Sequence, residues 1–257
     1  MTSVIPADDA AAIEQAVDAL GRGEVVGVPT DTVYGLAVDP FRPDAVARVF
    51  ALKARPSDVA LPVLVAGWDQ VELIAGPLPV SARYLADRHW PGALTLVVPR
   101  NRGFTADLGG RESPPFTVGV RWPDHPVIQA LCSAVGPLAV TSANRHGQAP
   151  LTAAVEVASA FPRPGSEIGS QARWEIGVTE AELGDLGVGI VLDGGTCDGT
   201  PSTVVECRGP ASRCLRDGAL PWSTLYDAAT RRDPGSISAD GTPQSPSVDE
   251  TGGTGGN

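Results

Sequence analysis

A chain of 257 residues, of which 42% are hydrophobic, can bury the core of one large domain or two small ones. Its formal net charge of −11 argues against general binding to a nucleic-acid backbone, because such binding draws its affinity from a basic face. No apolar run approaches the ~18 residues that cross a bilayer, and residues 1–9 lack the basic and apolar regions of a secretory signal. We therefore expect a cytoplasmic protein with no membrane partner.

Apolar periodicity predicts helices and strands that alternate along the chain. Apolar residues at helical spacing, with capping or breaking residues at the ends, predict helices at 8–20, 43–54, 80–88, 126–135 and 152–160. Runs of β-branched or alternating apolar residues predict strands at 24–29, 61–65, 93–99, 116–121, 138–141, 190–192, 203–207 and 212–215. This alternation predicts an α/β fold with a twisted, mixed sheet that is flanked by helices.

Two stretches interrupt the alternation. Residues 161–187 mix Pro, Gly and charges around Trp174, which indicates an irregular insertion. Residues 223–257 end in a segment rich in Gly, Pro and Ser that cannot bury enough apolar surface to offset chain entropy. We therefore expect a folded domain over 1–222 and a low-complexity, disordered tail over 223–257.

The titratable side chains exclude several kinds of site. The four cysteines form no C-x-x-C pair and the three histidines are scattered, so the sequence predicts reduced thiols and no metal site in the protein. Of the 19 basic residues, Lys53 is the only lysine, and it does not lie in a G-K-[ST] loop. A lone ammonium among guanidinium groups suggests a point charge placed where a guanidinium would not fit, although chance also explains it.

Several expected strands end in turns that carry hydroxyl or basic side chains. In an open α/β sheet, ligands bind where the strand ends separate into loops. Each turn alone is more often a capped loop than a site. In chain order they form a series: P-T-D-T-V-Y-G-L at 29–36, K-x-R-P at 53–56, W-P-G-x-L-T at 90–95, V-R-x-P-x-H-P at 120–126, T-S-A-N at 141–144, S-T-V-V at 202–205 and L-R-x-G at 215–218.

This series resembles the YrdC/Sua5 family, whose members are L-threonylcarbamoyladenylate synthases. The resemblance covers about residues 8–222 and implies a single YrdC-like domain with an open concave cleft, in the short form of the family. It implies ATP binding by Lys53, Arg55, Thr117, Ser142, Asn144 and Arg216. It implies L-threonine binding by Thr30, Thr32, Tyr34, Arg121 and Ser202. Lys53 and Arg55 are also the implied catalytic pair, because they would meet the ATP phosphates.

The resemblance also implies the reaction and the partners. L-threonine, bicarbonate or CO2, and ATP would give threonylcarbamoyl-AMP and pyrophosphate, for the threonylcarbamoyl modification of adenosine 37 in tRNA. Mg²⁺ would enter with the triphosphate, and Asp31 is a candidate outer-shell partner. The product would pass to the tRNA threonylcarbamoyl-transfer machinery, with weak or no direct binding of tRNA by this chain.

Two other functions remain open from the sequence. The same fold could bind double-stranded RNA or tRNA without catalysis, or it could be a carbamoyl-adenylating domain of the hydrogenase-maturation type. The chain also departs from the family pattern: Val59 and Ala60 stand where relatives have a polar residue followed by Pro or Gly. Leu64 replaces a His found in some relatives, and Pro150 cannot supply a hydroxyl that some relatives place there.

Overall fold

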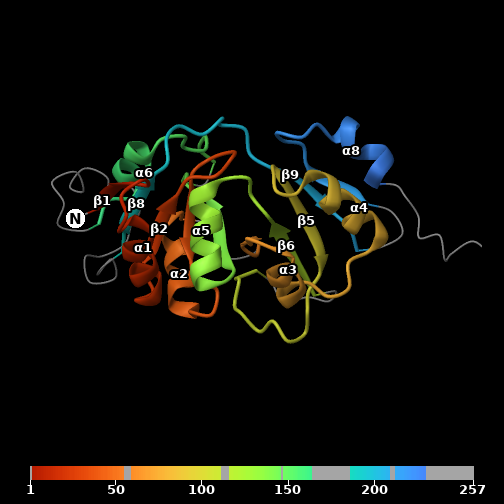
Figure 1. Cartoon of the computed structure of the whole chain (residues 1–257), viewed down its shortest axis with the longest axis horizontal. Coiled ribbons are helices and arrows are strands. Elements are labelled where there is room, and N and C mark those ends of the chain that lie inside the picture. The colour runs from red at the N-terminus through yellow and green to blue at the C-terminus, as the bar shows by residue number, and fades with distance from the viewer. Residues whose placement is uncertain are drawn as a thin grey trace, which may run out of the picture.

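The computed structural model describes residues 2–54, 59–110, 116–145, 147–163, 186–208 and 212–229. The strands of these residues form one mixed sheet that runs along the molecule (Figure 1), in the order β1-β8-β2-β3-β7-β4-β6-β5-β9-β10. The strands are β1 Ser3–Pro6, β2 Val25–Val28, β3 Gly35–Val38, β4 Val63–Leu64, β5 Leu94–Pro99, β6 Thr117–Arg121, β7 Leu138–Ser142, β8 Val188–Asp193, β9 Thr203–Glu206 and β10 Arg213–Arg216. The α/β fold class with a mixed sheet is therefore confirmed.

Helices pack on both faces of this sheet. They are α1 Ala12–Gly21, α2 Pro43–Leu52, α3 Trp68–Ile74, α4 Val80–His89, α5 Pro126–Val135, α6 Ala154–Ala160 and α8 Trp222–Ala229. Apolar residues of α1 and α5 form one core with β2, β7 and β8. Residues of α2, α3, α4 and α6 form a second core on the other face, which also contains the inward residues of β5 and β6.

The sequence analysis missed four elements of the fold. β1 and β3 are short, and β3 is buried at every position, so it lacks the alternation that marks a half-exposed strand. α3 follows β4 after a short bend. The fourth, α8, corrects the expected end of the domain at residue 222: the helix continues to Ala229, and Leu225 is fully buried against the core that contains α4. The remainder of the expected tail, residues 230–257, and most of the expected insertion, residues 164–185, lie outside the described residues.

One extended segment connects distant parts of the sheet. Residues 194–202, which we call the strap, lead from β8, the second strand in the sheet order, to β9, the ninth (Figure 1). The strap is held to the domain by backbone hydrogen bonds from Cys197 N to Thr152 O (2.9 Å) and from Gly199 N to Thr32 O (2.8 Å). It therefore passes directly over the turn that follows β2.

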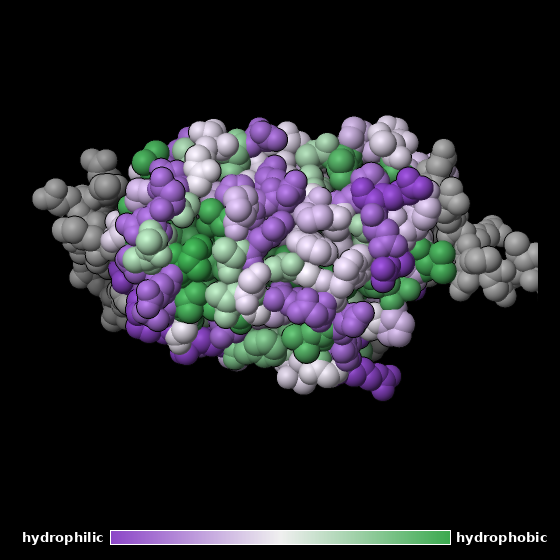
Figure 2. Space-filling view, in the orientation of Figure 1, coloured by the Kyte–Doolittle hydropathy of each residue, from purple (hydrophilic) through white to green (hydrophobic). Residues whose placement is uncertain are grey.

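The surface is mixed in character. Hydrophilic side chains cover most of the face shown in Figure 2, and hydrophobic ones form separate groups among them. Within the described ranges, no helix has the length and apolar character needed to cross a membrane.

Candidate functional site

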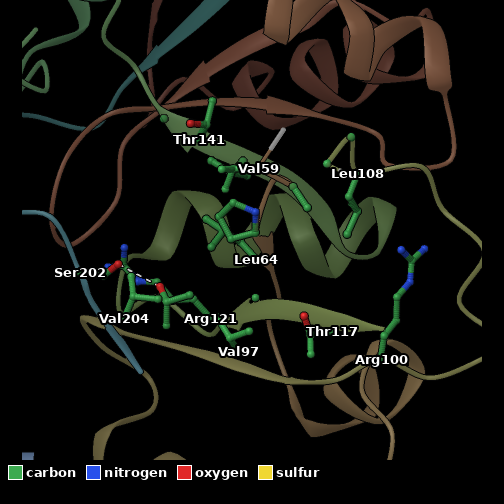
Figure 3. A pocket seen from close by; sticks show the side chains of 18 of the residues that line it. Val59, Leu64, Val97, Arg100, Leu108, Thr117, Arg121, Thr141, Ser202 and Val204 are labelled. Carbon is green, nitrogen blue, oxygen red and sulfur yellow. Dashed lines mark hydrogen bonds between the residues drawn. The ribbon is translucent and has the colours of Figure 1, made fainter. Parts of the chain in front are cut away.

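A cleft of about 1510 Å³ opens over the β4, β6, β5 and β9 part of the sheet. The described residues that line it belong to strands and loops and not to helices, because α1 and α5 cover only the other part of this face. Figure 3 shows Ser202 and Arg121 toward one end of the cleft and Arg100 at the other, with Val97 and Thr117 between them. The structure thus brings residues that are far apart in the sequence to one cavity.

Strand alternation explains which side chains reach the cleft. Along β6, Thr117, Gly119 and Arg121 line the cavity, whereas Val118 and Val120 point into the core on the opposite face. The neighbouring strands follow the same rule and contribute Pro62, Leu64, Thr95, Val97, Ser202, Val204 and Glu206. In the register of the sheet, Leu64 lies opposite Arg121, and Val97 lies opposite Gly119.

Arg121 is buried at one end of the cleft and is held by three acceptors. Its Nε donates to Gly92 O (3.0 Å), its Nη1 donates to Thr32 Oγ1 (2.9 Å), and its Nη2 pairs with Asp31 Oδ1 (2.6 Å). Burial lowers the pKa of Arg121, and Asp31 opposes that shift. The guanidinium has five N–H groups, so these bonds orient it and leave donors for a ligand. Asp31, the candidate outer-shell partner of Mg²⁺, pairs with Arg121.

The hydroxyl groups next to Arg121 are close to one another. Thr30 Oγ1 donates to Val33 O (2.7 Å), accepts from Thr32 N and Val33 N (3.2 Å each) and lies 3.0 Å from Thr32 Oγ1. Thr32 Oγ1 accepts from Arg121. The Thr30 hydroxyl is therefore engaged within the turn, and the Thr32 hydroxyl is the one that lies beside the guanidinium.

A second arginine faces the same end of the cleft. Arg216 donates from Nε to Ser202 O (3.0 Å) and from Nη2 to Ser202 Oγ (3.1 Å), and Ser202 Oγ also lies 2.9 Å from Thr95 Oγ1. Burial lowers the pKa of Arg216, and the positive charge of Arg121 lowers it further. The two guanidinium groups therefore repel each other across a shared space, which an anionic ligand would relieve.

Lys53 lies at the edge of the site rather than on the wall of the cleft. It is buried at the end of α2 and donates to Ser142 O and to Asn144 Oδ1 (3.3 Å). Ser142 lines the cleft, and its hydroxyl donates to the same Asn144 Oδ1 (2.5 Å). Asn144 Nδ2 binds two further carbonyls, which fixes the loop after β7. Lys53 and Asn144 thus hold Ser142 in place.

The remaining expected site residues differ in what they contribute. Thr117 lines the cleft. Tyr34 also borders it, but its hydroxyl donates to Gly195 O (2.8 Å) in the strap, and burial raises its pKa to about 12. It therefore anchors the strap. Arg55 lies outside the described residues, so its expected contact with ATP stays a prediction.

Some lining residues were not anticipated from the sequence. Thr95, Gly119, Val97 and Glu206 reach the cleft because of strand alternation and register. A count of every second residue from Arg121 and Ser202 would have found Gly119 and Glu206, and Thr95 and Val97 are on the face of β5 opposite Leu94, Leu96 and Val98. Val59, Ala60 and Leu64, which depart from the family pattern, all line the cleft. Leu64 gives an apolar wall beside Arg121.

In the described part of the chain, no three His, Cys, Asp or Glu side chains come close enough to hold a metal ion. The cleft offers Arg121 and Arg216 with several hydroxyls at one end, Arg100 at the other, and apolar side chains along its floor. Such an arrangement can bind a molecule that carries carboxylate or phosphate groups together with an uncharged part.

Comparison with known proteins gives a consistent result. A family model named for Sua5, YciO and YrdC, with the description "Telomere recombination", matches residues 18–165. A putative threonylcarbamoyl-AMP synthase of Mycobacterium tuberculosis is 37% identical over 209 residues, which are 81% of this chain and 84% of the relative. The threonylcarbamoyl-AMP synthase of Bacillus subtilis is 36% identical over 81% of this chain, which spans 54% of that relative's length.

Solved structures agree with the family match. The crystal structure of Pyrococcus abyssi Sua5 complexed with L-threonine has a TM-score of 0.69 and 32% identity, over 84% of this chain and 56% of that one. Escherichia coli YciO has a TM-score of 0.67 over 85% of this chain and 96% of that one, and at 21% identity it shows the shared fold alone.

Proposed function

This chain belongs to the Sua5/YciO/YrdC family, and we propose that it is an L-threonylcarbamoyladenylate synthase. It would convert L-threonine, bicarbonate or CO2, and ATP into threonylcarbamoyl-AMP and pyrophosphate. The observation that carries the proposal is the end of the cleft where Arg121 and Arg216 face a common space beside Thr32. Among the relatives, the name threonylcarbamoyl-AMP synthase and a structure with L-threonine both point to the same reaction.

Arg121 is suited to hold the carboxylate of threonine. Its fork is already oriented by Asp31, Thr32 and Gly92, so little entropy is lost when a second carboxylate binds. The Thr32 hydroxyl lies beside this fork and would hydrogen-bond a polar group of the same substrate. The amino group of threonine would then lie inside the cleft, where it can take up CO2.

The chemical step needs no covalent intermediate with the protein. The threonine nitrogen attacks CO2 and loses a proton, and an oxygen of the resulting carbamate attacks the α-phosphorus of ATP. The bond from that phosphorus to the bridging oxygen breaks, and pyrophosphate leaves with the electron pair. The protein would contribute positioning and positive charge near the leaving group, through Arg216 and the Lys53–Arg55 turn.

Mg²⁺ would arrive bound to the triphosphate and help to neutralise it. This fits the residues present, since Mg²⁺ commonly keeps substrate phosphates and water as ligands and needs few protein carboxylates, and Asp31 is already engaged by Arg121. We also propose that the product passes to the tRNA threonylcarbamoyl-transfer machinery.

The direct test is to incubate the protein with ATP, Mg²⁺, bicarbonate and one amino acid at a time, and to measure the adenylate by mass and pyrophosphate by a coupled assay. We expect an adenylate that requires both threonine and bicarbonate. A protein that forms no adenylate with any amino acid, but binds RNA with an affinity that falls steeply with salt, would instead be the binding module.

The role of Lys53 gives a second test of the same function. Lys53→Ala removes the ammonium that binds Ser142 O and Asn144 Oδ1, so we expect threonine-dependent pyrophosphate release to fall at least about 100-fold, as is typical for the loss of a positioned charge. Circular dichroism should show that the variant still folds. Arg22→Ala, which removes a mostly exposed cation paired with Glu24, is the control and should keep normal activity. A folded Lys53→Ala enzyme with near-normal rates would contradict the assignment.

A further inference from the structure

Gly119 is a glycine in the middle of a strand at the centre of the cleft floor. Thr117 and Arg121, two residues away on either side, carry side chains into the cavity, whereas Gly119 leaves its position bare. Glycine weakens a strand interior, and where it occurs there it often marks a bulge or the close approach of a ligand or another backbone. β6 pairs in continuous register through Gly119, so no bulge accounts for it.

The backbone conformation does not require glycine at this position. The φ of Gly119 is outside the left-handed region, so its backbone suits any residue. An added Cβ would meet Pro62 Cβ at 3.3 Å and Thr95 Cγ2 at 3.6 Å, so Pro62 would have to shift by a few tenths of an ångström. Glycine therefore relieves the contact with Pro62 and also keeps this part of the cleft floor free of a side chain.

The neighbours of Gly119 on the cleft floor are uncharged. Val97 lies opposite it on β5, and Pro62 lies against its other side. We call Pro62, Gly119 and Val97 the ledge. Arg121 and Arg216 lie toward one end of the cleft and Arg100 lies at the other (Figure 3), and Arg121 is two residues from Gly119, which is about 6.7 Å along a strand. The carboxylate and phosphate groups of the substrates would be drawn to these cations, which leaves the ledge for an uncharged part of a substrate.

We propose that the ledge binds the purine ring of the nucleotide substrate, and that Gly119 is bare so that the ring can lie flat against the strand. A planar ring on exposed backbone gains contact over its whole face, and a Cβ would lift it off by about the length of a C–C bond. This inference rests on the proposed function for the identity of the nucleotide. It adds a specificity-determining residue that touches the base and leaves the amino-acid end of the cleft unchanged.

The test compares Gly119→Ala and Gly119→Val with the wild type. We expect the KM for ATP to rise about 10-fold for alanine and about 100-fold for valine, at a KM for threonine within about two-fold of normal. The added Cβ must displace Pro62 slightly, whereas both residues favour a strand more than glycine does, so we expect melting temperatures within a few degrees of the wild type. Gly21→Ala is the control, because an added Cβ at the end of α1 meets nothing within 4 Å.

Inorganic tripolyphosphate tests the binding of phosphates without that of the ring. Because it has no ring, it would bind at the cations and leave the ledge empty, so its inhibition constant should be the same in wild type and both variants. Equal loss of tripolyphosphate and ATP binding, an unchanged KM for ATP, or a rise in the KM for threonine would each overturn the proposal. If valine prevents folding, the alanine variant decides.

A binding measurement keeps this inference distinct from the proposed function. Calorimetry with adenosine, which lacks phosphates, should show binding to the wild type that weakens at least about 10-fold in Gly119→Ala. This result would support the ledge even if the wild type formed no adenylate. Adenosine that binds both proteins equally would refute the ledge even if the wild type were fully active.

Discussion

At the scale of single residues, Arg121 shows how one side chain can be both a structural partner and a binding group. Its three bonds to Gly92, Thr32 and Asp31 come from three different nitrogens, which only a planar guanidinium provides. The Asp31 carboxylate offsets part of the cost of burying this cation. The cation is thus fixed before any substrate binds.

Arg121→Lys tests whether the fork matters beyond the charge. A lysine keeps the positive charge but cannot reach all three acceptors and a substrate carboxylate together, so we expect the KM for threonine to rise about 10- to 100-fold, the equivalent of one or two charged hydrogen bonds. The KM for ATP should change much less. Arg22→Lys, at an exposed pair with Glu24, provides the matched control and should have no effect. Equal KM values for threonine in Arg121→Lys and wild type would show that charge alone suffices.

Single residues also show how much of the site the sequence could predict. Thr30, Thr32, Arg121, Ser142, Ser202 and Arg216 were expected from short motifs, and the structure places them on one cleft. The pairing of Asp31 with Arg121 could not be foreseen, because 90 residues separate them and only the register of the sheet brings them together. Lys53 was expected on the phosphates, and its contact with Ser142 depends on where α2 ends against the loop after β7.

At the scale of elements, the junction from β6 to α5 links the site to the strap. β6 ends at Arg121 and α5 begins at Pro126, and His125 between them caps the helix by accepting from Val127 N at Nδ1 (3.3 Å). Burial lowers the pKa of His125 below its usual 6.5, although Asp31, Asp124 and a hydrogen bond with the Gly194 backbone oppose the shift. The cap therefore requires a neutral imidazole with Nδ1 unprotonated, whereas the contact with the Gly194 backbone favours the protonated form.

This junction predicts a pH-dependent loss of stability. Because the pKa of His125 is lower in the folded protein than in the unfolded chain, the unfolded chain takes up the proton first as the pH falls. The free energy of unfolding should be unaffected above about pH 6.5 and should fall as the pH drops below it, with a further contribution from His89, whose pKa is also lowered by burial. Urea unfolding at pH 7.5 and 5.5 measures this.

His125→Asn isolates the contribution of the cap. Asparagine also caps helix N-termini but does not titrate, so its variant should lose less stability between the two pH values than the wild type does. An identical pH dependence in both proteins would assign the whole effect to other groups.

At the scale of the whole molecule, the strap connects strands from the two halves of the sheet. It leads from β8, the second strand in the sheet order, to β9, the ninth. Its backbone is fixed at Cys197 and Gly199, which leaves one residue, Asp198, between the two anchors. The end of the strap carries Ser202 to Arg216.

A change in the length of the strap should therefore act asymmetrically. Deletion of Asp198, an exposed residue between the two anchored positions 197 and 199, should lower the melting temperature by several degrees and raise the KM for threonine, because β9 or the turn at Thr32 must shift. Insertion of one glycine after Asp198 should have a smaller effect, since the extra residue can bulge into solvent. Melting curves and steady-state kinetics of the two variants decide this, and equal tolerance of both changes would show that the strap is slack.

The pairing of β1 with β8 sets a limit on how early the protein can fold during its synthesis. Ser3 pairs with Ile190, so the partner of the first strand is made 187 residues later. At typical rates of about 5–20 residues per second, a ribosome needs about 10–40 s to make that interval. Such distant contacts also slow folding itself. The sheet is therefore completed only after most of the chain has left the ribosome. Until then β2 lacks β8, the strand that pairs with it in parallel.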